Sequence, residues 1–195
     1  PSRLQRRLNL RGMRFVIDFD FAAYYDQFEL DVNVRNFFAL RVRTASGGDE
    51  FFRLTRLPMG ACFAVAVAQT FTWTLCSPIM SAAQTGARVV VDTMIDNVRI
   101  AAYDPQEFLA AVRTFLNRAK HVGAAFGDMD DGVGGKRDVY SLLDQELLAL
   151  GAANMRGHTF LGETATVDGD RVAVSNTPRN LEKLSAAYNR MQAIL

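Results

Sequence analysis

The chain has 195 residues, of which 49% are hydrophobic and 22% are charged. This composition excludes an intrinsically disordered chain, and the length suits one principal domain with its own core. The formal net charge of +1 does not in itself indicate a nucleic-acid-binding protein, although arginines crowd the N-terminus at Arg3, Arg6, Arg7, Arg11 and Arg14. The sequence shows no secretion signal and no run of about 18 apolar residues, so we expect an intracellular protein with no membrane partner, in either the cytoplasm or the nucleus.

The N-terminal half predicts strands, turns and one helix. β-Branched and aromatic residues mark the strands, and Gly47-Gly48 marks the turn of a hairpin. The segment Leu57-Pro58-Met59-Gly60 interrupts regular structure before an alanine-rich helix. In chain order we expect a strand at 13–19 ending near Asp18 and Asp20, a helical turn at 22–29, hairpin strands at 37–43 and 51–54, and a helix at 64–80.

The C-terminal half predicts two further hairpins and three helices. Strands are expected at 88–91 and 97–102, with Asp96 at the tip between them. Pro105 suits the first turn of a helix at 105–122, whose apolar residues repeat at helical spacing. We also expect a helix at 139–150, a hairpin that begins at 159–162 and turns near 168–169, and a terminal helix at 179–195. This order predicts an α+β fold with helices on one face of the sheet.

Two aspartates are candidate metal ligands. A sheet of this kind can bring distant strand ends together, so Asp20 and Asp96 could meet at one end of it. Their carboxylates would then offer the hard oxygen ligands that suit Mg²⁺, which prefers a few carboxylates together with substrate phosphates. The alternative for either aspartate alone is a turn cap or a solvent contact.

The segment 16–28 resembles the first catalytic motif of retroviral and retrotransposon reverse transcriptases. In that motif an aspartate precedes an aromatic residue by five positions. Asp20 places Tyr25 at the aromatic position, whereas Asp18 would place Ala23 there, so Asp20 is the preferred ligand. The resemblance implies that Tyr25 excludes a ribose 2′-hydroxyl by its shape.

Three later segments extend this resemblance in the same order. Residues 52–60, followed by Gln69, are similar to the second motif, a Leu-Pro-x-Gly turn that leads into a helix with a glutamine. Residues 89–98 resemble the Tyr-x-Asp-Asp hairpin, with Met94 in place of the tyrosine and Asn97 in place of the second aspartate. The segment 158–174 resembles the primer-grip hairpin, and Lys136 is a candidate for a general-acid lysine.

The resemblance implies an α+β polymerase right-hand palm over 1–175, with fingers largely absent, and a terminal helix at 176–195 that starts a thumb or connector. It implies RNA-directed DNA synthesis with two Mg²⁺ ions held by Asp20 and Asp96, and a weaker contribution from Asn97. The nucleotide would lie against Phe21, Tyr25, Gly60 and Gln69, and the primer grip would consist of Phe160, Leu161 and Gly162.

The implied partners are an RNA template, a DNA primer, deoxynucleoside triphosphates and the fingers, thumb and ribonuclease H segments of a larger polyprotein. We therefore expect the isolated chain to be inactive. Because Asn97 brings no negative charge, a second hypothesis is a catalytically degenerate palm that serves as a nucleic-acid-binding or assembly scaffold. A third is an unrelated α+β binding module.

Overall fold

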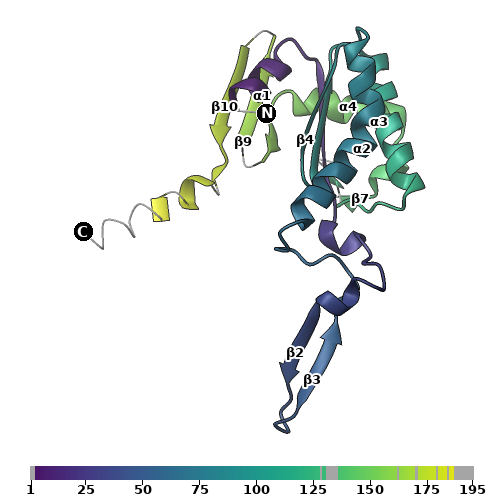
Figure 1. Ribbon diagram of the computed structural model, residues 1–195. Coiled ribbons are helices and arrows are strands. Elements are labelled where there is room, and N and C mark those ends of the chain that lie inside the picture. The colour runs from purple at the N-terminus through teal and green to yellow at the C-terminus, as the bar shows by residue number, and fades with distance from the viewer. Residues whose placement is uncertain are drawn as a thin grey trace.

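The computed structural model describes residues 3–127, 129–130, 136–161, 163–169, 171–178, 180–183 and 185–186. The fold is α+β, with helices packed against antiparallel sheets (Figure 1). The predicted fold class is confirmed at this level. Among the described residues, no helix is long and apolar enough to cross a membrane.

A three-stranded antiparallel sheet forms the centre of the molecule. Its strands are β1 (Phe15–Asp20), β4 (Val89–Met94) and β5 (Asn97–Ala102), in the order β1-β5-β4. They are rich in β-branched and aromatic residues, which pack well on a pleated surface. Because side chains alternate between the two faces of a strand, Ile17 and its neighbour Ile100 face the helices, whereas Val16 and Ala101 face away from them.

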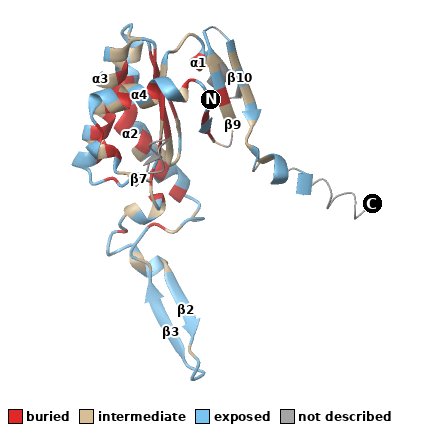
Figure 2. Ribbon diagram, turned by 180° about the vertical axis from the view of Figure 1, so that it is seen from behind, coloured by how far each residue is buried: buried red, intermediate tan, exposed pale blue. Residues whose placement is uncertain are grey.

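Three helices cover one face of this sheet: α2 (Ala64–Gln84), α3 (Pro105–His121) and α4 (Asp144–Asn154). Figure 2 shows their buried inner faces next to the buried strands. The side chain of Asp104 caps α3 by accepting hydrogen bonds from the backbone N–H groups of Gln106 and Glu107. α4 packs closely on α3, because a Cβ atom at Gly151 would come within 2.7 Å of the Phe108 ring.

The helix predicted at 139–150 is divided in the structure. A short 3-10 helix, η3 (Val139–Ser141), precedes α4, and the side chain of Glu146 accepts a hydrogen bond from the backbone N–H of Leu143 at 2.7 Å. This bond satisfies a donor at the start of α4. The prediction of one continuous helix was therefore wrong, because local capping starts a new helix at Asp144.

A second sheet lies against the opposite face of the central sheet. Its strands are β8 (His158–Phe160), β9 (Glu163–Asp168) and β10 (Arg171–Asn176), in the order β10-β9-β8. The helix α1 (Arg3–Leu10), which the sequence pattern did not predict, packs beside β10. A buried apolar cluster joins these elements to the back of the central sheet through Leu10, Val16, Ala101, Met155 and Ala165. The expected turn near 168–169 is present between β9 and β10.

A two-stranded hairpin projects from the body of the molecule (Figure 1). It consists of β2 (Ala39–Arg43) and β3 (Asp49–Arg53), and every residue of both strands is exposed (Figure 2). Two short 3-10 helices, η1 (Tyr24–Gln27) and η2 (Arg35–Phe37), lie between β1 and this hairpin. A further short pair, β6 (Met129–Asp130) and β7 (Lys136–Arg137), follows α3.

Candidate functional site

Asp20 and Asp96 lie at the same end of the central sheet. Asp20 is the last residue of β1, and Asp96 lies in the turn that joins β4 to β5. The backbone N–H of Phe21 donates a hydrogen bond to the backbone oxygen of Asp96 at 3.0 Å. Asp20 pairs with Asn97 across β1 and β5, and alternation directs both side chains away from the helices. The fold thus brings together the two predicted carboxylates and the amide of Asn97.

The charges of this site interact. Partial burial raises the pKa of the Asp20 carboxyl, and the nearby Asp96 carboxylate raises it further. The side-chain amide of Asn97 donates a hydrogen bond to Asp96 Oδ1 at 2.9 Å. Two carboxylates that repel each other form a favourable place for a cation, because a positive charge between them reverses the repulsion.

The donor set is small. No group of three or more His, Cys, Asp or Glu side chains within the described ranges is arranged to hold a metal ion. The site therefore offers the carboxylates of Asp20 and Asp96 and, after rotation, the amide oxygen of Asn97. Such a set suits Mg²⁺, which retains several waters and binds through one or two carboxylates plus substrate phosphates.

The helix α2 holds the turn that carries Asp96. Ile95 has a φ of 53°, a left-handed conformation that is unfavourable for a β-branched residue. The Gln69 side-chain oxygen accepts a hydrogen bond from the Ile95 N–H at 2.9 Å, and Thr72 Oγ1 donates one to the Ile95 carbonyl oxygen at 2.5 Å. The Tyr24 hydroxyl in turn lies 2.6 Å from Thr72 Oγ1. This network fixes an otherwise strained turn.

Gln69, one of the predicted nucleotide contacts, supports the β4–β5 hairpin. Its side-chain oxygen accepts the hydrogen bond from Ile95, and its amide nitrogen lies 3.3 Å from Thr93 Oγ1. Both ends of the side chain hold the β4–β5 hairpin. Its contact with a nucleotide stays a prediction. Sequence reasoning missed Thr72, although its spacing of three residues from Gln69 places both on one face of α2.

The segment after α3 secures the other flank of Asp20. The backbone N–H of Gly127 donates a hydrogen bond to the Asp20 carbonyl oxygen at 2.8 Å, and the N–H of Ala22 donates one to Ala125 at 3.0 Å. The Gln27 side chain also bridges Ala22 and Ala125. Backbone bonds therefore restrain the end of β1 on both sides.

The other predicted nucleotide contacts, Phe21, Tyr25 and Gly60, differ in how far they are buried. The ring of Phe21 is only 3% exposed and stacks on Tyr24 and Phe126, each at a centroid distance of 4.6 Å, so the ring belongs to the core. Tyr25 is half-buried at the junction of two apolar clusters. Gly60 has a φ of +97° in an open turn, a conformation that favours glycine.

The predicted primer-grip residues lie at the turn after β8. Phe160 is 4% exposed, and its ring lies 4.6 Å from the guanidinium carbon of Arg99. Leu161 occupies the turn with a φ of 52°. Gly162 lies outside the described residues, as does the side chain of Lys136. The Phe160 ring is therefore a packing group between the two sheets, and contact of this turn with a primer stays a prediction.

A buried row of charged residues crosses the central sheet two positions along β1 from Asp20. Asp18, Arg99 and Asp92 are neighbours across β1, β5 and β4, on the same face as Asp20. Arg99 and Asp92 form an ion pair whose side chains are 4% and 3% exposed, and the Asn9 amide donates to Asp92 at 2.9 Å. Burial raises the pKa of Asp18 to about 7 in spite of the neighbouring Arg99. The accessible Asp20 is thus better placed than Asp18 to meet a cation.

His158 of β8 completes this buried region. Burial lowers its pKa to about 4, and the charge of Arg99 acts in the same direction. The ring Nδ1 lies 3.2 Å from the carbonyl oxygen of Asn154. Sequence reasoning missed this buried group of charged residues. The signal that could have indicated it is the presence of charged residues within otherwise apolar strands.

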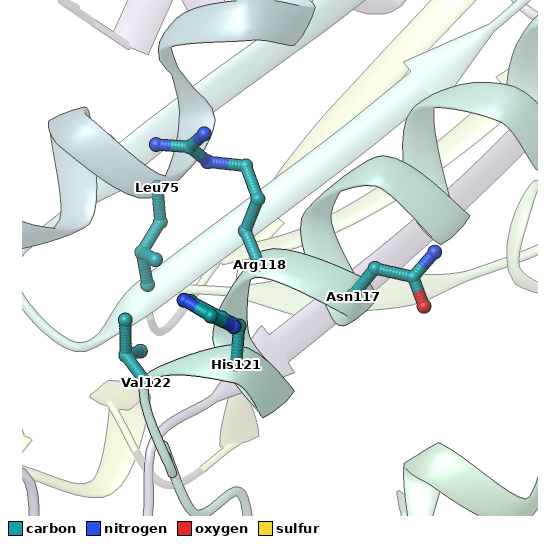
Figure 3. A pocket seen from close by; sticks show the side chains of 5 residues that line it. All are labelled: Leu75, Asn117, Arg118, His121 and Val122. Atoms are coloured by element: carbon teal, nitrogen blue, oxygen red, sulfur yellow. The ribbon is translucent and has the colours of Figure 1, made fainter.

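A separate pocket of about 260 Å³ lies between α2 and α3 on the helix side of the sheet (Figure 3). Leu75, Asn117, Arg118, His121 and Val122 line it. Arg118 donates a hydrogen bond to the carbonyl oxygen of Thr74 at 3.0 Å. The helix layer separates this pocket from the face that carries Asp20.

The chain matches no protein-family model and no curated protein sequence.

Proposed function

We propose that this chain is the palm of a reverse transcriptase of retroelement type, in which Asp20 and Asp96 hold two Mg²⁺ ions for RNA-directed DNA synthesis. The observation that carries the proposal is the meeting of these two residues, 76 positions apart in the sequence, at one end of the sheet face that points away from the helices. The antiparallel sheet with helices on one face and the order of the four motifs also support it.

The carboxylate pair fits this chemistry. Two divalent ions bound about 3.5–4 Å apart would activate the primer 3′-hydroxyl and neutralise charge on the transferred phosphate. Asp20 and Asp96 would hold them. Partial burial and, in addition, the Asp96 carboxylate raise the pKa of Asp20, and a cation would relieve the repulsion between the two carboxylates. The bonds from Gln69 and Thr72 to Ile95 would keep Asp96 in place while substrate binds.

Tyr25 is the proposed specificity residue. It follows Asp20 by five positions and is held between two apolar clusters, which restrict its motion. A rigid ring under the sugar of the incoming nucleotide would reject a ribonucleotide by a clash with the 2′-hydroxyl.

The alternative is a palm that binds nucleic acid or supports assembly without catalysis. The observation that favours it is the Asn97 amide, which donates a hydrogen bond to Asp96 where the resemblance leads us to expect a second carboxylate. An amide contributes a dipole but no negative charge to cation binding.

A primer-extension assay separates these functions. The chain, and any longer natural form of it, is given an RNA template, a DNA primer, deoxynucleotides and Mg²⁺. Synthesis that is lost in Asp20→Asn and Asp96→Asn, but retained in the exposed neighbour control Asp26→Asn, supports the polymerase. Template binding without synthesis in every form, unchanged by Asp20→Asn, supports the scaffold.

A further inference from the structure

Two arginines and a tyrosine gather at the end of the central sheet opposite to Asp20 and Asp96. Arg14 precedes β1, Arg88 precedes β4 and Tyr103 follows β5. Because β5 is antiparallel to both of the other strands, all three residues lie at the same end of the sheet. The Arg14 N–H donates to the Ala102 carbonyl oxygen at 3.0 Å, and the Tyr103 N–H donates to the Arg88 carbonyl oxygen at 3.3 Å. Backbone bonds therefore fix the spacing of the three residues.

Both guanidinium groups lie against the same ring. The central carbon of Arg88 is 4.3 Å from the centroid of Tyr103, and that of Arg14 is 5.7 Å from it. Such contacts leave the N–H edges of a guanidinium available to a planar or tetrahedral anion while the aromatic face supports the flat group.

In the part of the chain that the structure describes, neither Arg14 nor Arg88 forms an ion pair. Glu107 accepts a hydrogen bond at 3.2 Å from the backbone N–H of Arg88, not from its guanidinium. All three members of the group are exposed, and Tyr103 is 41% exposed. Two like charges held on one ring form a surface that complements a polyanion.

We propose that Arg14, Arg88 and Tyr103 form a clamp for the phosphodiester backbone of a nucleic acid. Arginine binds phosphate through paired N–H groups, and an exposed tyrosine ring can stack with a base at the same contact. The six-residue strands between the clamp and Asp20 span about 20 Å, so this is a second binding surface and does not depend on catalysis at the first.

Salt dependence of binding tests the clamp. The 195-residue chain is titrated against a fluorescent mixed-sequence DNA duplex between about 50 and 200 mM salt. Removing two phosphate contacts in Arg14→Gln/Arg88→Gln should weaken binding for every sequence and should reduce the slope of log K against log salt by about two. Lys120→Gln, which removes one positive charge from an exposed position on α3, should leave the slope within error.

One further control separates the clamp from the catalytic site, and three results would overturn the proposal. Binding measured with EDTA, which leaves no divalent cation for Asp20 and Asp96, should show the same salt slope, which separates the clamp from the proposed catalytic site. An unchanged slope in the double arginine variant, with an unchanged melting temperature, would overturn the proposal. So would the absence of duplex binding, or stronger competition by an acidic polypeptide than by DNA of equal charge.

Discussion

The side-chain oxygen of Gln69 accepts a hydrogen bond from the backbone N–H of Ile95 at 2.9 Å, although 26 positions separate the two residues. This bond ties α2 to the turn that presents Asp96. Because Ile95 holds a left-handed conformation, the turn depends on such external support.

Gln69→Ala should lower the free energy of unfolding by about 1–2 kcal/mol, since the hydrogen bonds to Ile95 and Thr93 are both lost. It should also weaken Mg²⁺ binding, because Asp96 is less well positioned. Gln84→Ala, at the exposed end of the same helix, is the matched control and should change neither quantity. Urea denaturation and a Mg²⁺ titration measure both effects, and equal behaviour of the two variants would refute the support role.

Tyr24→Phe should destabilise the fold by about 1–2 kcal/mol, because the hydroxyl bonds to the Ala68 carbonyl at 3.0 Å and to Thr72. Among the described residues the Tyr25 hydroxyl has no hydrogen bond, so Tyr25→Phe should have almost no effect on stability. The two adjacent tyrosines thus serve as test and control in the same denaturation experiment. An equal loss in both variants would show that the Tyr24 network is energetically unimportant.

Tyr25→Ala should raise the incorporation of ribonucleotides in a catalytically active form of the protein, because the proposed clash with the 2′-hydroxyl is removed. Competition between deoxy- and ribonucleotides in primer extension measures the change. Unchanged selectivity would count against Tyr25 as the specificity residue and would leave the metal site unaffected.

Asn97→Asp should tighten Mg²⁺ binding, on the order of tenfold, because a third carboxylate joins Asp20 and Asp96. Without a cation it should lower stability, since the hydrogen bond to Asp96 is replaced by repulsion. Asn97→Ala removes the amide without adding charge and provides the control. DNA synthesis that appears only with Asn97→Asp would identify a degenerate catalytic site, whereas Mg²⁺ affinity no higher than that of Asn97→Ala would show that this side chain does not face the cation.

The stability of the fold should depend on His158 below neutral pH. Its pKa falls from an ordinary 6.5 to about 4 on folding, so the unfolded chain binds more protons between these values. The contribution of neutral His158 is fully present above pH 6.5 and is lost as pH falls towards 4, by about 3 kcal/mol. Asp18 titrates in the opposite sense because its folded pKa is raised.

A comparison with His158→Gln isolates this effect from Asp18, Asp92 and Arg99, which both proteins retain. The difference in unfolding free energy between the two proteins should grow from pH 4 to pH 6.5 and then level off. A difference that does not vary with pH would mean that the ring is accessible to protons in the folded state.

The sequence predicted the elements that depend on local patterns. The strand before Asp20, the hairpin around Asp96 and the helix after Pro105 follow from alternation, turn residues and helical spacing, all of which are local properties. Their residues occupy the predicted elements, with ends displaced by a few positions.

Pairings between distant segments could not be predicted in the same way. The ion pair of Arg99 with Asp92 places charges in buried strands, where composition alone suggests solvent exposure. The placement of Phe160 beneath Arg99 depends on how the second sheet docks, which no local pattern encodes. The support of Ile95 by Gln69 likewise became visible only from the packing of α2 on β4.

The most direct test of the central proposal is the paramagnetic effect of Mn²⁺ on the backbone amide signals of the chain. Mn²⁺ substitutes for Mg²⁺ at oxygen-rich sites and broadens the signals of nearby nuclei. The proposal predicts selective broadening at Asp20, Phe21, Asp96 and Asn97, which disappears in Asp20→Asn/Asp96→Asn and persists in Asp26→Asn. Broadening that is centred elsewhere, or that survives the loss of both carboxylates, would contradict a metal site at Asp20 and Asp96.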